Sequence, residues 1–259
     1  MTKLRGLGPV LLLAFAPAAA LADDYRFEVN GTFNRDMPSE EDSPFGDVDQ
    51  GALEGTWYFA PVSTDNVPLA EAAYLGRASF LTASAASIDF DGLVDTSLNG
   101  QGVNVGYYIP NTMFYASLGV SRGQFITAIN STIVAKDYDT TVFGSVGIAP
   151  IDGLLVTTDF NEDGYDPNLT ARYVGKLPNN HFYAGSVSLL DPDQGDVAVG
   201  IDLDYYFDEA TSLGIGYGEP GSRWELRAQR FFSKSWAASF SAYTADGVDG
   251  IGVNITWRH

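Results

Sequence analysis

The last nine residues of the chain alternate between large apolar side chains and small or polar ones, as far as the terminal carboxylate. The apolar positions are Ile251, Val253, Ile255 and Trp257, and those between them are Gly252, Asn254, Thr256 and Arg258. Successive side chains of a β-strand point to opposite faces, so this segment predicts a strand with one apolar and one polar face. A chain that ends on such a strand is typical of a barrel that closes within a membrane.

The first 22 residues have the features of a secretory signal. Lys3 and Arg5 give a positive start, an apolar run extends from Val10 to Phe15, and a small-x-small cleavage sequence ends at Ala22. We therefore expect residues 1–22 to direct export through the Sec pathway and residues 23–259 to form one domain. Removal of the signal takes away two of the 14 basic residues and leaves 12 against 33 acidic ones, a net charge of −21.

This composition excludes several classes of protein. An acidic chain has no basic stripe to displace counterions from phosphates, so nucleic acid is not an expected partner. Cysteine is absent, which rules out disulfides and a thiol nucleophile. No run of 18 or more apolar residues follows the signal, so we expect no helical membrane span. A transmembrane β-barrel has this bulk composition because only every second strand residue meets lipid.

Fourteen segments have the pattern of strands. The clearest, Val197 to Phe207, alternates strictly over eleven residues, about one tilted membrane crossing. The first spans residues 25–34, and the others begin near Leu53, Phe80, Leu98, Phe114, Thr141, Leu154, Leu169, Phe182, Leu213, Trp224, Trp236 and Ile251. We predict an all-β fold, an up-and-down antiparallel transmembrane β-barrel of 14 strands, or of 12 if two weak segments belong to loops.

The connections alternate between tight turns and longer polar segments, as in barrels with short periplasmic turns and longer outer loops. Tight turns are expected at residues 109–112, 149–153, 177–180, 207–211 and 232–235, and outer loops at 35–51, 91–97, 122–140, 161–168 and 191–196. Aromatic residues gather beside the tight turns and predict a girdle at the periplasmic interface. They are Trp57, Tyr58, Phe59, Tyr107, Tyr108, Tyr205, Tyr206, Phe207, Phe231, Phe232 and Trp236.

One connection departs from the tight-turn rule. Residues 68–76 predict a short helix with Pro68 in its first turn and Gly76 at its end. We expect this helix to lie outside the lipid, across or near the periplasmic mouth of the barrel.

This region also carries a resemblance to a known family. Tyr58-Phe-Ala-Pro-Val-Ser-Thr-Asp-Asn66 and Pro68-Leu-Ala-Glu-Ala-Ala-Tyr-Leu-Gly-Arg-Ala-Ser79 resemble the segment that follows the second strand in the general porins of Gram-negative bacteria. The specific match covers about twenty residues, and the rest of the chain agrees in layout. The resemblance implies an outer-membrane β-barrel channel without catalytic residues. The chain departs from many such barrels in ending on His259 instead of an aromatic residue.

Three further patterns favour ordinary structural explanations. Asp159 to Gly164 matches the opening of a calcium loop, but Thr170 stands where the bidentate Glu belongs, so a polar hairpin loop is favoured. The acidic segment after Arg35 indicates a solvated loop, or alternatively one that gathers cations at a pore mouth. The glycines of Gly214-Ile-Gly216-Tyr-Gly218 are not followed by a helix, so we interpret them as residues lining a barrel.

Charged residues on the polar face of the strands are the candidate functional set, because a lipid-facing Arg or Lys at mid-bilayer costs about 2–4 kcal/mol. The predicted pore-lining residues are Arg26, Glu28, Glu54, Arg172, Lys176, Asp202, Asp204, Glu225 and Arg227. Arg230 lies on the same, lipid-facing side of its strand as Trp224 and Leu226. We therefore expect it near the strand end, where its charged group can reach the membrane interface.

These residues predict a porin for passive diffusion of ions and small polar solutes, with cations preferred. Expected partners are outer-membrane lipid, lipopolysaccharide and the barrel-assembly machinery, and no cofactor or metal is expected. Three alternatives stay open: an enzyme barrel, a soluble exported β-sandwich with an adhesin or lectin role, and a plugged barrel. The enzyme is disfavoured because the only histidines, His181 and His259, fall in a tight turn and at the terminus.

Overall fold

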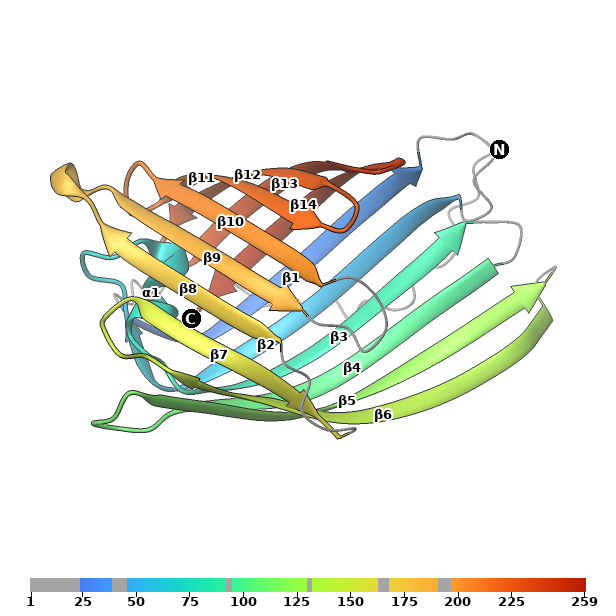
Figure 1. Ribbon diagram of the computed structural model, residues 1–259, viewed down its shortest axis with the longest axis horizontal. Helices are drawn as coiled ribbons and strands as arrows, with labels where there is room; N and C mark the ends of the chain where they lie inside the picture. Colours follow the sequence, from blue (N-terminus) through green and yellow to red (C-terminus); the bar gives the residue numbers. More distant parts are fainter. Residues whose placement is uncertain (1–23, 39–45, 92–94, 130–131, 163–167, 191–196) are drawn as a thin grey trace.

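The chain folds into a closed β-barrel of 14 antiparallel strands in sequence order (Figure 1). The computed structural model describes residues 24–38, 46–91, 95–129, 132–162, 168–190 and 197–259. The strands are β1 (Asp24–Pro38), β2 (Asp47–Ser63), β3 (Phe80–Asp91), β4 (Asp95–Tyr108), β5 (Phe114–Ile129), β6 (Thr132–Ile148), β7 (Leu154–Asn161), β8 (Leu169–Lys176), β9 (Phe182–Leu190), β10 (Ala198–Tyr206), β11 (Thr211–Glu219), β12 (Arg223–Ser233), β13 (Trp236–Ala245) and β14 (Val248–Arg258).

Each strand pairs with its neighbours in the chain, and β1 pairs with β14 to close the cylinder, with Val29 opposite Trp257 and Phe33 opposite Val253. The up-and-down barrel of 14 strands is thus confirmed, and the alternative of 12 is excluded. The predicted signal at residues 1–22 lies outside the described residues. In the part of the chain that the structure describes, no helix has the length and apolarity that a membrane crossing requires.

The barrel wall has two heights. Strands β2 to β6 contain 12 to 17 residues, whereas β7 to β13 contain 8 to 11 (Figure 1). The outer loops expected at residues 35–51, 91–97 and 122–140 were wrong in extent, because strand pairing continues through most of them. Above the lipid both faces of a strand meet water, so apolar alternation ends although the hydrogen-bonded ladder continues.

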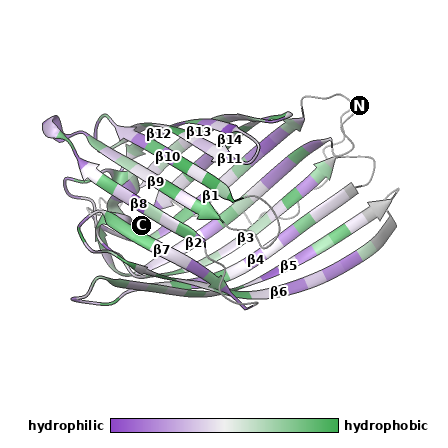
Figure 2. Cartoon of the chain, viewed as in Figure 1, coloured by the Kyte–Doolittle hydropathy of each residue, from purple (hydrophilic) through white to green (hydrophobic). Residues whose placement is uncertain are grey.

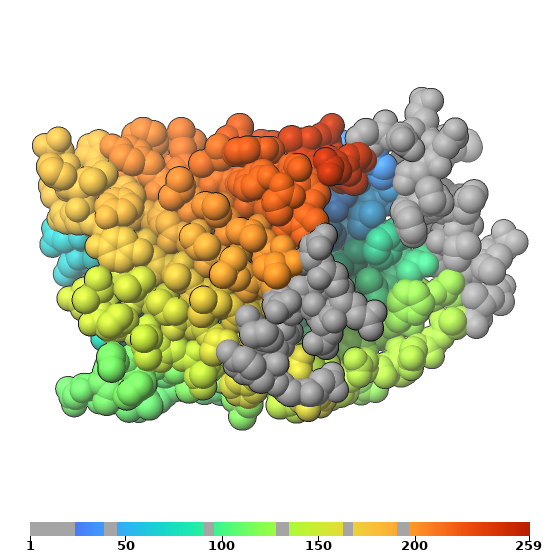
Figure 3. All heavy atoms as spheres, viewed as in Figure 1, coloured from blue at the N-terminus to red at the C-terminus, as the bar shows by residue number. Residues whose placement is uncertain are grey.

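The outer face of the barrel carries the apolar residues of the alternating pattern. Leu203, Leu226 and Ile255 are all more than half exposed, as side chains that face lipid must be in an isolated protein. Figure 2 shows apolar and polar residues alternating along the strands, and in Figure 3 the side chains of β8 to β12 form a closed outer wall. Arg230 is exposed opposite Thr211, the first residue of β11, so it lies at the strand end as required.

The predicted aromatic girdle is only half correct. The rings that alternate outward are exposed near the periplasmic turns: Trp57, Phe59, Tyr107, Tyr205, Phe207, Phe232 and Trp236. Their neighbours Tyr58, Tyr206 and Phe231 are buried inside the barrel. Adjacent strand residues point to opposite faces, so a run of two or three aromatics must divide between the lipid face and the interior.

The connection between β2 and β3 contains the short helices η1 (Leu69–Glu71) and α1 (Ala72–Leu75), while η2 (Pro178–Asn180) forms the turn between β8 and β9. The helix expected at 68–76, near the periplasmic mouth, is confirmed, and the structure adds that it enters the barrel instead of lying beneath it. Leu69, Glu71 and Ala72 are buried, and α1 lies within the periplasmic end of the barrel (Figure 1). We refer to residues 67–78 as the inserted segment.

Candidate functional site in the barrel interior

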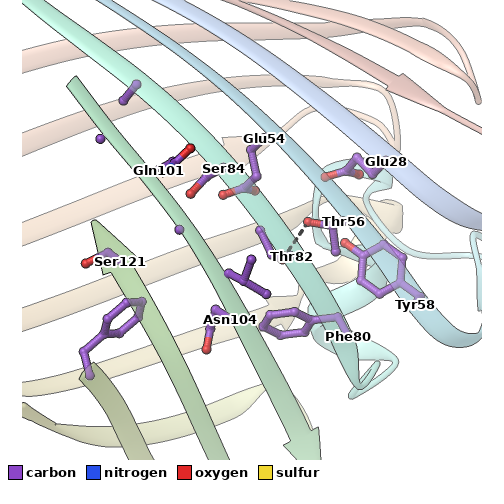
Figure 4. A pocket seen from close by; sticks show the side chains of 15 residues that line it. Glu28, Glu54, Thr56, Tyr58, Phe80, Thr82, Ser84, Gln101, Asn104 and Ser121 are labelled. Carbon is purple, nitrogen blue, oxygen red and sulfur yellow. Dashed lines mark hydrogen bonds between the residues drawn. The ribbon is translucent and has the colours of Figure 1, made fainter. Parts of the chain in front are cut away.

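The interior of the barrel contains two cavities with different linings. One, of about 580 Å³, is lined by residues of β1 to β6 that include the neutral polar side chains of Thr56, Thr82, Ser84, Gln101, Asn104 and Ser121 (Figure 4). The other, of about 380 Å³, lies against β8 to β14 and includes charged residues on facing strands. The interior wall is therefore divided into a hydroxyl-rich side and a charged side.

The hydroxyl-rich side follows from inward-facing Ser and Thr residues of β2, β3, β5 and β6. Thr56 and Thr82 share a hydrogen bond of 2.9 Å across β2 and β3, drawn as a dashed line in Figure 4. The Oδ1 atom of Asn104 is buried with no hydrogen-bond partner in the described structure. Glu54 pairs across the strands with Ser84 and makes no ion pair or hydrogen bond with a described residue. The Glu54 carboxylate, which lines the cavity, is therefore an acceptor available to a solute.

The charged side is centred on Arg227 of β12. Its guanidinium lies 2.6 Å from Asp202, 3.5 Å from Asp204 and 3.8 Å from Glu225. A β-carbon at Gly216 would lie 2.9 Å from Asp202 Oδ1 and 3.0 Å from Arg227 Nη1, so a larger residue there would displace the ends of these two side chains. The glycines of β11 thus accommodate facing charged side chains.

The inserted segment packs against strands from opposite parts of the wall. Ala72 packs with Tyr25 and Tyr58 of β1 and β2. Tyr74 packs with Val174, Phe182 and Tyr206 of β8 to β10, while Leu69 packs with Phe231 and Ala237 of β12 and β13. Leu69 N also donates to Glu209 O at 2.7 Å. The segment therefore spans the interior at its periplasmic end.

Two polar side chains of the segment, Glu71 and Tyr74, attach it to the charged side through four hydrogen bonds. Buried Glu71 accepts hydrogen bonds from Arg172 Nη2 at 2.6 Å and from Tyr206 Oη at 2.5 Å. Tyr74 Oη donates to Arg172 O at 2.7 Å and to Gly153 O at 3.1 Å. Burial raises the pKa of Tyr74 to about 12, so this phenol stays protonated at neutral pH and keeps donating.

Arg258, the last residue of β14, connects the segment to both ends of the chain. Its Nε lies 2.5 Å from Glu28 Oε2, and its Nη1 donates to Leu69 O at 2.7 Å. The guanidinium also lies 4.4 Å from the Tyr25 ring centroid and 4.7 Å from that of Phe231. The buried Arg258 guanidinium therefore contacts β1 and the inserted segment and links both of them to β14.

The structure turns eight of the nine predicted pore-lining residues to the interior. Glu28 and Glu54 line the larger cavity, and Arg172, Asp204, Glu225 and Arg227 line the smaller one. Asp202 pairs with Arg227, and Lys176 lies at the periplasmic end opposite inward-facing Phe182. Their role in permeation stays a prediction.

Arg26 is the exception, and its predicted inward orientation was wrong. The NH groups of Arg26 and Phe27 both donate to His259 O, at 2.9 and 2.8 Å, which marks a β-bulge. The extra residue shifts the alternation, so Tyr25 is buried while the Arg26 side chain is exposed. A single inserted residue reverses the face of everything before it.

Sequence reasoning did not single out Glu71, Arg258 and Tyr206 as functional residues. Arg258 already stood on the polar face of the last strand, and that position could have added it to the interior set. Glu71 gave a weaker signal, a lone carboxylate between Leu69, Ala70 and Ala72. Only the fold shows that Glu71, which has an alanine on each side, is buried inside the barrel.

The calcium-like segment, Asp159 to Gly164, begins within a strand of the barrel. Asp159 and Asn161 belong to β7, and the remainder of the calcium-like segment, residues 163–167, lies outside the described residues. No group of three or more metal-ligating side chains occurs within the described ranges. His181 Nδ1 lies 2.6 Å from Tyr205 Oη at the periplasmic end.

Comparison with known proteins identifies the family. No curated protein matches the chain. The outer membrane protein Omp33 of Acinetobacter baumannii superposes with a TM-score of 0.71 at 19% identity, covering 92% of this chain and 99% of that one. A TodX monoaromatic hydrocarbon channel with a deletion (deltaS2S3) gives a TM-score of 0.54 at 9% identity, covering 92% and 90%. At these identities the likeness supports the fold alone.

The family model described as "Putative general bacterial porin" matches residues 1–257. This match covers nearly the whole chain, and together with the closed barrel it places the protein in the bacterial outer membrane. The family and the fold indicate a channel rather than an enzyme. The chain belongs to the general bacterial porin family.

Proposed function

We propose that this porin allows passive diffusion of ions and small polar solutes across the outer membrane, with a preference for cations. The observation that carries this proposal is the interior of a closed barrel, with a cavity of about 580 Å³ against β1 to β6. Eight-stranded barrels are filled by side chains and barrels of 16 to 18 strands leave an aqueous channel, so 14 strands favour a modest pore.

The position of the inserted segment supports a route along the hydroxyl-rich side. Its buried contacts lie on β1, β2, β8 to β10, β12 and β13, whereas the larger cavity begins at β1 and β2 and extends from there over β3 to β6. The hydroxyl groups of this side can exchange hydrogen bonds with a hydrated solute. The segment restricts this route to small solutes.

The charge of the interior supports the preference for cations. Six carboxylates face three guanidinium groups around the two cavities: Glu28, Glu54, Glu71, Asp202, Asp204 and Glu225 against Arg172, Arg227 and Arg258. Glu54 is the carboxylate without a basic partner among the described residues. An excess of fixed negative charge raises the local concentration of cations.

A salt-gradient measurement tests this preference. In planar bilayers we expect the wild-type reversal potential to indicate cations over anions, and Glu54→Lys to move it toward anions. A unit charge at 4 Å in water contributes about 1 kcal/mol, about a fivefold change in local ion concentration. Asp49→Asn is the control, because Asp49 pairs with Arg35 at 3.0 Å on the outer face. An anion-selective wild type would refute the preference alone.

The inserted segment also favours a second candidate, a barrel that is closed at rest and has a structural role. The two functions differ in one observable: a closed barrel gives no conductance steps in a bilayer, whereas the proposed porin gives steps. Lipopolysaccharide and the barrel-assembly machinery remain predicted partners of either form.

A further inference from the structure

The basic residues at the extracellular end of the outer face are of two kinds: some form ion pairs with carboxylates and others do not. On β1, Arg35 faces outward and its Nε lies 3.0 Å from Asp49 and 3.8 Å from Asp47, so its charge is neutralised. On β5 and β6, Arg122 and Lys136 form no ion pair with a described residue. In a chain with 33 acidic and 14 basic residues, two adjacent unpaired cations require an explanation.

Both cations gather around one aromatic ring. The Arg122 guanidinium lies 4.6 Å from the Tyr138 ring centroid, and Lys136 Nζ lies 5.4 Å from it. Gln124 pairs with Tyr138 across the strands, and Thr140 pairs with Arg122. Asp137 and Asp139 alternate with these residues and so point to the opposite face of β6. We refer to Arg122, Lys136, Tyr138, Gln124 and Thr140 as the basic patch.

The basic patch lies at the outer edge of the lipid belt. Arg122 shares its face with Leu118 and Val120, which are 58% and 45% exposed and face lipid. It is eight residues beyond Phe114, the first residue of β5 after the periplasmic turn. At about 3.3 Å per residue and a tilt of about 40°, this corresponds to roughly 20 Å along the membrane normal, against an apolar band of about 25 Å.

Lys136 is twelve residues from Ile148, the last residue of β6 before the next periplasmic turn. The same estimate gives roughly 30 Å along the normal. The two cations therefore bracket the level at which the hydrocarbon of the outer leaflet gives way to its headgroups. A guanidinium and an ammonium at this level, with amide and hydroxyl donors beside them, match the oxygens of a phosphate group.

We propose that the basic patch binds the phosphorylated headgroup of lipopolysaccharide in the outer leaflet. Arg122 and Lys136 donate charge-assisted hydrogen bonds to a phosphate oxygen, and Gln124 and Thr140 donate to the neighbouring sugar. The site is on the lipid-facing wall, so it is independent of permeation through the interior and would hold even in a barrel that does not conduct.

Binding of lipid A to the folded, detergent-solubilised protein tests the proposal, with native mass spectrometry as readout and a chelator present to remove divalent bridges. We expect wild type to bind bisphosphorylated lipid A at least about tenfold more tightly than dephosphorylated lipid A, since each charge-assisted hydrogen bond contributes about a factor of ten. The double variant Arg122→Gln, Lys136→Gln should lose this preference. Arg35→Gln, which alters a neutralised base at the same rim, should retain it.

Two results would overturn the proposal. One is a double variant that binds phosphorylated lipid A as wild type does. The other is wild-type protein that binds phosphatidylglycerol as tightly as lipid A, which would indicate general attraction of anionic lipid. Folding of each variant is checked by heat-modifiable migration. If the double variant does not fold, Lys136→Gln alone must lower the preference, and added NaCl must weaken wild-type binding of the phosphorylated form.

Discussion

Replacing Glu71 with Ala is expected to increase the single-channel conductance and the open fraction of the porin. The substitution removes a buried carboxylate that holds Arg172 at 2.6 Å and Tyr206 at 2.5 Å. Breaking a buried ion pair costs about 3–5 kcal/mol because the remaining charge is left uncompensated. If the lost free energy weakens the attachment of the inserted segment to the barrel wall, the equilibrium population with the segment detached rises by at least about a hundredfold.

Detachment has a second readout that does not depend on conductance. The chain contains no cysteine, so a single Cys at buried Ala72 reports on exposure of the segment. We expect a thiol reagent to modify Ala72→Cys slowly in the wild-type background and rapidly beside Glu71→Ala.

The matched control is Asp152→Asn, which removes an exposed ion pair with Arg77 at 3.5 Å at the base of the segment. Exposed pairs contribute about 0–1 kcal/mol, so conductance should stay near wild type. If Glu71→Ala labels rapidly but conducts as wild type does, the segment is not the restriction on the route.

Replacing Arg258 with Ala is expected to destabilise the barrel more than any other single change at its periplasmic end. The substitution leaves Glu28 Oε2 and the carbonyl of Leu69 without the Arg258 donor and removes a cation from between the rings of Tyr25 and Phe231. The expected loss is about 3–5 kcal/mol, mainly from the unpaired carboxylate. Urea unfolding followed by heat-modifiable migration measures this loss as a lower midpoint.

Arg230→Ala is the control, because Arg230 is exposed at the same end and makes no ion pair in the described part of the chain. Its midpoint should change little. Arg258→Lys should be intermediate, since one ammonium cannot reproduce the fork that reaches both Glu28 and Leu69. Equal midpoints for Arg258→Ala and wild type would show that the contact set around Arg258 contributes nothing to closure.

The fold was largely predictable because the membrane imposes a simple pattern. Strict alternation in Val197 to Phe207 and in the last strand predicted which face meets lipid, and the tight turns predicted the periplasmic end. The same rule failed above the lipid, where β5 and β6 continue without apolar alternation. The rule also failed at Arg26. A one-residue bulge in β1 cannot be recognised from composition, yet it reverses which side chains before it point outward.

The interior site was predictable only in part. Eight of the nine charged residues lie on the inward face of their strands, but alternation did not indicate which of them contact one another. Glu71 forms hydrogen bonds with Arg172 and Tyr206, which lie 101 and 135 residues away in the sequence. Local sequence patterns cannot predict contacts over such separations. Pro68 and Gly76 predicted a helix, and neither residue could indicate whether it would lie beneath the barrel or within it.

The sequence by itself thus determined the barrel class and the division of side chains between lipid and water, because both depend on spacing along the chain and on the cost of placing charge in hydrocarbon. Tertiary structure alone decided that the inserted segment enters the interior and that Arg258 joins it to both ends of the chain. Those outcomes depend on the width of the closed cylinder and on contacts between distant strands, which exist only once β1 pairs with β14.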